Sequence, residues 1–319
     1  MTSAGPTHDP VIVIVEPMQA GAVAALRAAH AVLHDPALAS APARLAAALA
    51  GARALILRDS LPVDAALLAQ APRLAVIGRL GAGLGGIDLA ACRARGLEVI
   101  SATGANADSV AEYVMLAIGQ LLRGGAFGAT AEVAAGGWPR ARLGQVREIR
   151  GKTLGIVGFG DIGRRVAKLA RAFGMAIVAH DPVLPEGHAG WSETPTERLE
   201  LAALLARADA VTLHVPPVPA TRGLIAAPQL ALMKPGAVLV NTAGGGVVEE
   251  AALAAALRGG QLAGAALDVF GEEPLPPGSP LAGCPNLILS PHVAGMTLES
   301  DARVSTLIAE RVLVALAMG

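Results

Sequence analysis

Three glycines and a nearby acidic residue in the segment 151–182 are spaced as a phosphate-binding turn requires. The run Thr153–Val157 is apolar and rich in β-branched residues, as is typical of a strand, and the pattern G-x-G-x-x-G follows it directly. In such a turn the first glycine permits tight folding, the second lets backbone approach a pyrophosphate, and the third lets the helix pack close to the strand. The residues predicted to hold phosphate are Gly158, Gly160, Asp161, Ile162 and Gly163.

The elements after the turn complete a dinucleotide-binding unit. Apolar residues recur at helical spacing from Ile162 to Phe173, so a helix begins where free N–H groups and the helix dipole favour an anion. The run 175–179 predicts the next strand, and Asp181 closes it, eighteen residues beyond Gly163. Its carboxylate can accept hydrogen bonds from ribose hydroxyls and would repel a 2′-phosphate. NAD is therefore expected in preference to NADP.

A bare glycine pattern is weak support, because glycine-rich chains produce such patterns by chance. The segment Gly81–Gly86 (GAGLGG) is a second glycine-rich stretch in the same chain. The copy at 158–163 is supported by its context: a strand pattern directly before it, an amphipathic helix after it, and an acid eighteen residues beyond Gly163. The dinucleotide hypothesis therefore rests on context as well as on the glycines.

Alternating strand and helix patterns predict that both halves of the chain are α/β. The glycine pattern at 158–163 is called the fingerprint below. Before it, apolar runs at 11–15, 31–33, 54–57, 74–77 and 97–100 alternate with helical patterns at 20–29, 44–50, 63–69 and 89–95. After it, strands are expected at 210–215, 237–241, 264–269 and 287–289, with helices at 199–206, 228–233, 249–258 and 297–316. A long buried helix is expected at 106–122. Regular alternation of this kind indicates parallel sheets.

Composition excludes several classes of function. The formal net charge is −1 and aromatic residues are 2% of the 319 residues, so neither nucleic acid nor a membrane surface is an expected partner. Two cysteines form neither a disulfide framework nor a metal motif, which fits a reducing compartment. The N-terminus MTSAGPTHDP lacks the basic region of a signal peptide, and no apolar run is long enough to span a membrane. We expect a cytoplasmic protein.

Seven motifs in order give the chain its resemblance to a known family. They are GAGLGGID (81–88), NADSVAEY (106–113), GFGDIG (158–163), ADAVTLHVPPVPATRGLI (208–225), MKPGAVLVNTAGGGVVEE (233–250), ALDVFGEEPLP (266–276) and SPHVAG (290–295). With them the chain resembles the D-isomer-specific 2-hydroxyacid dehydrogenase family, which includes phosphoglycerate, glyoxylate/hydroxypyruvate and D-lactate dehydrogenases. The motifs do not select among glyoxylate, hydroxypyruvate, phosphoglycerate, lactate and sulfolactate-like substrates.

The resemblance implies a fold and an assembly. A Rossmann-type dinucleotide-binding domain (103–292) is expected to be inserted into a flavodoxin-like α/β substrate domain (1–102 and 293–319). The family forms homodimers, so the helix 106–122 and the irregular segment 123–150 are expected at a dimer interface. From the residues alone, 123–150 reads equally as a connector between domains.

The resemblance also assigns the catalytic pair and further cofactor contacts. His292 matches the acid/base histidine that exchanges a proton with the reacting oxygen while hydride moves at C2 of a 2-oxo or 2-hydroxy acid. Glu273 matches the glutamate that pairs with this histidine. The further cofactor-binding residues are His214, Val215, Thr221, Thr242, Ala243, Asp268, His292 and Gly295.

One position departs from the family pattern where it matters for substrate binding. The family motif N-T-A-R-G-G reads here Asn241-Thr242-Ala243-Gly244-Gly245-Gly246, so Gly244 stands in place of the arginine that clamps the substrate carboxylate. Losing a preorganised donor of this kind typically costs about 10²–10³ in rate. Backbone N–H groups at Ala82 and Gly83 could still hold a carboxylate. Arg79 is either a substitute cation or a salt-bridged arginine at a strand end.

Two hypotheses therefore remain open. In the first, the chain is a working NAD-dependent 2-hydroxyacid dehydrogenase whose activity is reduced by the change at Gly244. In the second, it is a catalytically weak or inactive NAD(H)-binding protein with a regulatory or structural role. No metal is expected in either case.

Overall fold

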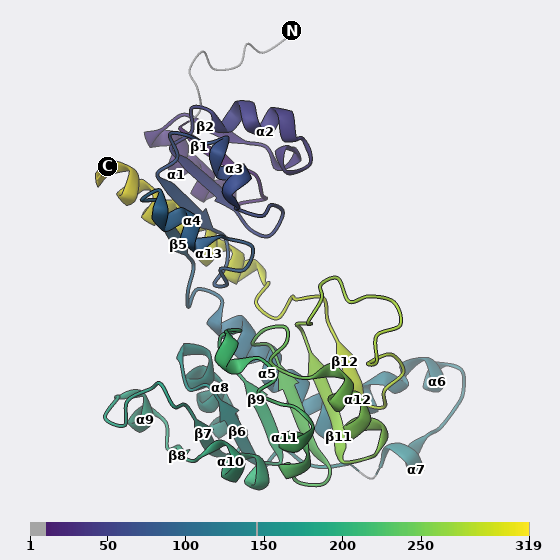
Figure 1. Cartoon of the computed structure of the whole chain (residues 1–319). Coiled ribbons are helices and arrows are strands. Elements are labelled where there is room, and N and C mark those ends of the chain that lie inside the picture. Colours follow the sequence, from purple (N-terminus) through teal and green to yellow (C-terminus); the bar gives the residue numbers. More distant parts are fainter. Residues whose placement is uncertain (1–10, 145, 319) are drawn as a thin grey trace. The chain divides into compact units, whose positions relative to one another are not determined.

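A computed structural model describes residues 11–144 and 146–318, and the chain in it divides into two compact units (Figure 1). The first unit comprises the described residues up to Asn106 together with those from Met296 onward, and the second runs from Ala107 to Gly295. The predicted domain boundaries, after residues 102 and 292, lie a few residues earlier. The N-terminal stretch 1–10, for which the sequence predicts no signal peptide, lies outside the described residues.

The first unit is a five-stranded parallel sheet in the order β2-β1-β3-β4-β5. Its strands are β1 (Ile12–Ile14), β2 (Val32–His34), β3 (Ala54–Leu57), β4 (Val76–Arg79) and β5 (Glu98–Ser101). The helices are α1 (Ala20–Ala29), η1 (Pro36–Ser40), α2 (Pro42–Leu49), α3 (Ala65–Ala69), α4 (Leu89–Ala94) and α13 (Leu298–Met318). This strand order is the flavodoxin-like one.

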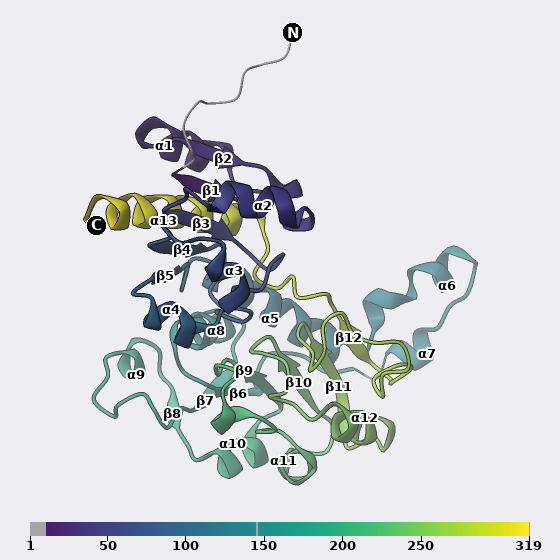
Figure 2. The same ribbon diagram turned by 45° about the horizontal axis from the view of Figure 1, so that its top comes forward.

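Helices cover both faces of this sheet. Neighbouring residues of a strand point to opposite sides, so each strand contributes to two cores. Ile12 and Ile14 pack in one core with α1 and α13, while Val13 packs in the other with α2, α3 and α4. The helix α13, far away in sequence, lies along the first unit's strands in both views (Figures 1 and 2). A side chain at Gly78 of β4 would lie 2.8 Å from Ile308 of α13, so the helix packs directly on the backbone.

The second unit is a seven-stranded parallel sheet in the order β12-β11-β10-β9-β6-β7-β8. Its strands are β6 (Thr153–Val157), β7 (Ala176–His180), β8 (Glu197–Arg198), β9 (Ala210–Leu213), β10 (Ala237–Asn241), β11 (Leu262–Leu267) and β12 (Leu287–Leu289). The chain leaves β6 toward β7 on one side and returns to β9 on the other, which is the Rossmann arrangement with its switch point between β6 and β9. The predicted fold class is confirmed.

Two helical layers bury this sheet. On one face α5 (Ala107–Leu122) and α8 (Asp161–Ala172) pack on Leu154 and Ile156 of β6. On the other face lie α10 (Leu201–Arg207), α11 (Ala227–Leu232) and α12 (Glu250–Arg258). The same unit contains the short helices α9 (Gly190–Glu193) and η3 (Pro219–Thr221). The strand ends that carry the fingerprint are thus held on a rigid, doubly covered sheet.

The segment 123–150 forms short pieces rather than one long element. They are η2 (Ala126–Ala129), α6 (Thr130–Ala134) and α7 (Arg140–Leu143), and their side chains are mostly exposed. Phe127 is 71% exposed and Trp138 is 77% exposed. Neither side chain belongs to one of the four hydrophobic cores found among the described residues.

Several short elements were not expected from the sequence: η1, η2, α6, α7, β8, α9 and η3. The strand β8 is a polar pair, Glu197–Arg198, that adds to the edge of the sheet beside β7. An exposed two-residue edge strand has no apolar run by which to recognise it. The expected helix near Leu199 begins instead at Leu201, because Leu199 still donates its N–H to Ala179 of β7.

Within the described part of the chain, no single helix is long and apolar enough to cross a membrane. Together the segments Ala107–Leu122 and Ala126–Ala134 have the length and composition, but they are bent by 71°. The first of them, α5, is a core helix of the second unit.

Candidate active site

The fingerprint turn between β6 and α8 excludes side chains at two of its three glycines. Gly158 has φ +92°, and a Cβ on it would lie 2.5 Å from the backbone oxygen of His214. A Cβ on Gly163 would lie 2.3 Å from the oxygen of Gly158. The chain therefore needs glycine at both positions to bring β6, β9 and the start of α8 together.

The middle glycine has a different environment. A Cβ on Gly160 would meet nothing within 4 Å, and Gly160 caps α8 without a side-chain hydrogen bond. Asp161 at the first turn is ion-paired with Arg165, and Ile162 is partly buried against the core. Open space beside uncapped N–H groups at the start of a helix is the environment that a diphosphate requires.

Asp181 follows β7 at the same edge of the sheet. One carboxylate oxygen accepts the N–H of Phe159 at 2.8 Å, and the other accepts those of Val183 and Leu184, each at 2.9 Å. The hydrogen bond from Phe159, the residue after Gly158, thus fixes the carboxylate next to the fingerprint turn. This is the position in which an acid meets the ribose of a dinucleotide.

Across the switch point, the residues after β9 are held by local bonds. The His214 ring contacts the hydroxyl of Thr212 at 3.0 Å, and burial lowers the pKa of His214 to about 3, so the ring is neutral. Val215 packs against the core on the α10–α12 side. The hydroxyl of Thr221 donates to Pro216 O at 2.5 Å and accepts the N–H of Val218 at 3.0 Å, which closes the loop 216–221.

The turn after β10 contains an unsatisfied buried hydroxyl. The Oγ1 atom of Thr242 is buried and has no hydrogen-bond partner, while the neighbouring turn is held by Asn241, whose side chain accepts from Ala243 N and donates to Gly244 O. A buried polar atom without a partner costs about 1–3 kcal/mol unless a ligand satisfies it. Thr242 therefore fits a site that a polar cofactor completes.

Glu273 and His292 are in direct contact. The ring Nδ1 of His292 lies 2.8 Å from Oε2 of Glu273, and the other carboxylate oxygen accepts the N–H of Phe270 at 2.9 Å. The imidazole is 65% exposed and the glutamate 37%. Because Nδ1 faces the carboxylate, Nε2 is the ring atom left to meet a reactant.

The loop with Gly244 is adjacent to this pair but offers it no cation. A Cβ on Gly245 would lie 1.7 Å from Phe270 O, so the loop touches the residue whose N–H holds Glu273. Gly244 is buried, and a Cβ on it would lie 2.7 Å from Cβ of Pro217. The space where an arginine side chain would begin is therefore filled by the ring of Pro217.

Asp268 was expected to bind cofactor, and its visible bonds are to the chain itself. It is 2% exposed and accepts the N–H groups of Val293 and Ala294 and the hydroxyl of Ser290. These bonds hold the loop that carries His292 and ends at the partly buried Gly295. A cofactor contact at Asp268 or Gly295 stays a prediction.

In the first unit, Arg79 is engaged with its own neighbours. Its side chain is ion-paired with Asp59 and donates from Nε to Gly83 O at 3.1 Å, and the residue is 6% exposed. Of the two interpretations of Arg79, this geometry favours the salt-bridged arginine at a strand end. Ala82 and Gly83 are partly or fully exposed, and a Cβ on Gly83 would meet nothing within 4 Å.

The sequence reasoning missed four residues that build the site of the second unit: Tyr113, Pro217, Asn241 and Ser290. All four lie inside quoted motifs, but their roles depend on contacts between motifs. A useful signal was available for Tyr113, the only tyrosine of the chain, placed in a helix expected to be buried.

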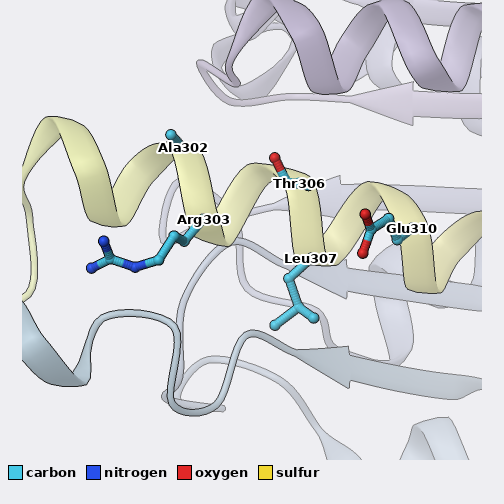
Figure 3. Close-up of a pocket in the computed structure, with 5 residues that line it drawn as sticks. All are labelled: Ala302, Arg303, Thr306, Leu307 and Glu310. Carbon is cyan, nitrogen blue, oxygen red and sulfur yellow. The ribbon is translucent and has the colours of Figure 1, made fainter.

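Two other features are separate from these residues. A cavity of about 350 Å³ lies on α13 in the first unit, lined by Ala302, Arg303, Thr306, Leu307 and Glu310 (Figure 3). It contains none of the predicted site residues. Among residues 11–144 and 146–318, no group of three or more His, Cys, Asp or Glu side chains could hold a metal ion.

Comparison of sequences identifies related proteins. The sequence model described as "D-isomer specific 2-hydroxyacid dehydrogenase, NAD binding domain" matches residues 116–294. The (S)-sulfolactate dehydrogenase of Chromohalobacter salexigens is 49% identical over 302 residues, covering 94% of this chain and 96% of that protein. The D-3-phosphoglycerate dehydrogenase of Mycobacterium tuberculosis is 41% identical over 277 residues, or 86% of this chain, which spans 51% of that longer protein.

Solved structures are similar to this chain over nearly its whole length. The TT0316 protein of Thermus thermophilus aligns with a TM-score of 0.84 at 33% identity, covering 96% of this chain and 97% of that one. The D-lactate dehydrogenase of Aquifex aeolicus, solved with NAD and lactic acid, aligns with a TM-score of 0.83 at 27% identity, covering 96% and 95%.

Proposed function

Because the chain belongs to the D-isomer specific 2-hydroxyacid dehydrogenase family, we propose that His292 and Glu273 carry its acid/base chemistry. The family activity is NAD-dependent interconversion of a small 2-hydroxy acid and its 2-oxo acid. The nicotinamide, when bound, supplies or accepts the hydride at C2. The chain's own residues must then bind the acid, orient it and move one proton.

The contact between Glu273 and His292 is the observation that carries this proposal. Glu273 fixes Nδ1 of the ring, and Phe270 N–H fixes Glu273, so Nε2 has a defined direction. In reduction the protonated ring donates from Nε2 to the carbonyl oxygen at C2, and in oxidation the neutral ring takes that proton back. A protein that only bound NAD would have no use for this pair.

The cofactor residues fit a dinucleotide. The open space at Gly160, the uncapped start of α8 and the unsatisfied Thr242 hydroxyl would hold the phosphates and a further polar group. Asp181 beside the turn would bind ribose hydroxyls and repel a 2′-phosphate. These features support a preference for NAD over NADP.

Substrate binding is where this chain departs from its family. With Gly244 against Pro217, we propose that the carboxylate is held by backbone N–H groups of the glycine loop at Ala82 and Gly83 instead of a guanidinium. The names of the relatives direct attention to 2-hydroxy acids with a second acidic group, since sulfolactate carries a sulfonate and phosphoglycerate a phosphate. We propose this substrate class.

A second candidate function has a specific observation in its favour. The ring of Pro217 fills the arginine's place, so the loss of the cation is built into the packing of the second unit. A weakly active or inactive NAD(H)-binding protein of the same fold would tolerate that change. Turnover decides between the two candidates.

Assembly and location are part of the proposal as well. Leu116 on α5 is 74% exposed, as are Phe127 and Trp138 to similar degrees in the segment 123–150. Large apolar side chains gathered on neighbouring segments are typical of an interface. We propose that α5 and this segment form a homodimer interface, and that the enzyme acts in the cytoplasm.

The decisive measurement is NADH oxidation with a panel of 2-oxo acids that includes 3-sulfopyruvate, 3-phosphohydroxypyruvate, hydroxypyruvate and glyoxylate. Turnover of any of them supports the dehydrogenase. His292→Ala is expected to lower kcat by about 10²–10⁴-fold, because one proton donor is removed. Undiminished turnover by that variant would remove His292 from the mechanism, and binding of NADH without turnover of any acid would support the second candidate.

The role of position 244 is tested with paired variants. Gly244→Arg alone is expected to gain little, because its Cβ meets Pro217. Gly244→Arg with Pro217→Gly is expected to raise kcat/KM by about 10²-fold. Pro217→Gly alone is the control for the loop change. Equal kcat/KM in the double variant and in this control would show that position 244 does not face the substrate.

A further inference from the structure

A chain of hydrogen bonds links helix α5 to the loop that carries His292. The hydroxyl of Tyr113 lies 2.5 Å from Oγ of Ser290, and that Oγ lies 2.6 Å from Oδ1 of Asp268. An ionised carboxylate only accepts, so Ser290 donates to Asp268 and is left to accept from Tyr113. The three groups thus form a directed relay from tyrosine to serine to aspartate.

Asp268, at the end of the relay, is hydrogen-bonded to residues on both sides of His292 in the sequence. Asp268 accepts the N–H of Val293 at 2.9 Å and that of Ala294 at 2.8 Å, the two residues after the histidine. Ser290 is two residues before it, and its backbone oxygen accepts the N–H of His292 at 3.0 Å. The loop is therefore tied to one buried carboxylate on both sides of the acid/base residue.

His292 needs such restraint because its backbone is unfavourable. Its φ is +57°, in the left-handed region that residues other than glycine rarely adopt. A conformation of this kind is strained and persists only where the surroundings hold it. Relaxation of the loop would turn Nε2 away from the direction that Glu273 gives it.

Tyr113 itself is suited to remain a donor. Burial raises the pKa of Tyr113, and the nearby charge of Asp268 raises it further, against the opposing effect of the hydrogen bond to Ser290. The phenol therefore keeps its proton, and can donate it to Ser290, at neutral pH. Asp268, at the other end of the relay, is almost fully buried and accepts its hydrogen bonds from Ser290 and the loop amides.

We propose that Tyr113 is a positioning residue for proton transfer: through Ser290 and Asp268 it holds the 290–294 loop in the conformation that presents His292. The inference rests on the proposed role of His292 and adds a residue on a different element. Tyr113 touches neither the histidine nor the reacting atoms, so its effect must pass through the loop.

The test is Tyr113→Phe in the full chain, which removes the hydroxyl and keeps the ring. We expect kcat to fall about 10-fold, because small misplacement of a catalytic group is costly, while KM for the 2-oxo acid and Kd for NADH stay within about twofold. Hydrogen exchange of peptides covering Val293 and Ala294 is expected to accelerate about fivefold or more. Glu112→Gln, exposed and next to Tyr113 on α5, is the matched control.

The outcomes separate the possibilities. A fall in kcat without faster exchange, or faster exchange without a fall in kcat, overturns the proposal. If Tyr113→Phe does not fold, Ser290→Ala is expected to show the same pair of changes, and Ser290→Thr, which restores a hydroxyl, to reverse them. If His292→Ala retains turnover, the proposed function fails, and exchange at Val293 and Ala294 then decides the relay by itself.

Discussion

The two glycine-rich turns of this chain, 158–163 and 81–86, have similar sequences but differ in how closely other atoms pack against their glycines. In the second unit, a side chain at Gly158 or Gly163 would overlap backbone at 2.5 Å or less. In the first unit, side chains at Gly81, Gly83 and Gly85 would meet nothing within 4 Å. Glycine at 158 and 163 is therefore required by the fold, whereas packing inside the first unit gives no reason for glycine at 81, 83 or 85.

The largest expected effect comes from adding one methyl group to each turn. Gly158→Ala combines a positive φ with a backbone overlap and is expected to lower the free energy of unfolding by about 3 kcal/mol or more. Gly83→Ala is expected to change it by no more than about 0.5 kcal/mol, while raising KM for the 2-oxo acid. Urea unfolding and steady-state kinetics measure both. Equal stability losses in the two variants would end the contrast between the turns.

His214, whose backbone oxygen lies against Gly158, is expected to make the stability of the second unit depend on pH. The pKa of His214 is lowered to about 3 from 6.5 in the unfolded chain, so the unfolded state binds the proton first as pH falls. Protonation of His214 therefore does not affect the free energy of unfolding above pH 6.5. Between pH 6.5 and 3 it lowers this free energy, by about 2 kcal/mol at pH 5. His214→Asn is expected to flatten unfolding free energy against pH in that window. A slope as steep as that of the wild type would assign the acid sensitivity to other groups.

Two carboxylates give the finest comparison. Asp181 in the second unit and Glu16 in the first each accept three backbone N–H groups after a strand, those of Glu16 coming from Arg58, Asp59 and Ser60. Each alanine variant is expected to lose about 1.5 kcal/mol of stability. Only Asp181→Ala is expected to shift the ratio of kcat/KM for NADH over NADPH, by about tenfold or 1.4 kcal/mol toward NADPH. A shift of the same size in Glu16→Ala would mean that the ratio follows stability.

Most elements of the fold were predictable because their signals are local. Apolar runs marked the buried strands, and the helix Ala20–Ala29 and the strands Ala54–Leu57, Thr153–Val157, Ala237–Asn241 and Leu287–Leu289 lie where the sequence placed them. The exposed edge strand β8 had no such signal. The strand order in the two sheets came from the structure, since periodicity does not say which strands are neighbours.

The sequence alone established the lineage, through seven ordered motifs, and it predicted the dinucleotide turn with Asp181. The roles of His292 and Glu273, and the missing arginine at 244, are predictions that the resemblance to the family adds. The tertiary structure decided what those residues touch. It put the ring of Pro217 where that arginine would begin, paired Arg79 with Asp59, and joined Tyr113 to the histidine loop through Ser290 and Asp268. The reason is physical: a turn is encoded by neighbours in sequence, while contacts between distant strand ends exist only once the sheet has brought them to one edge.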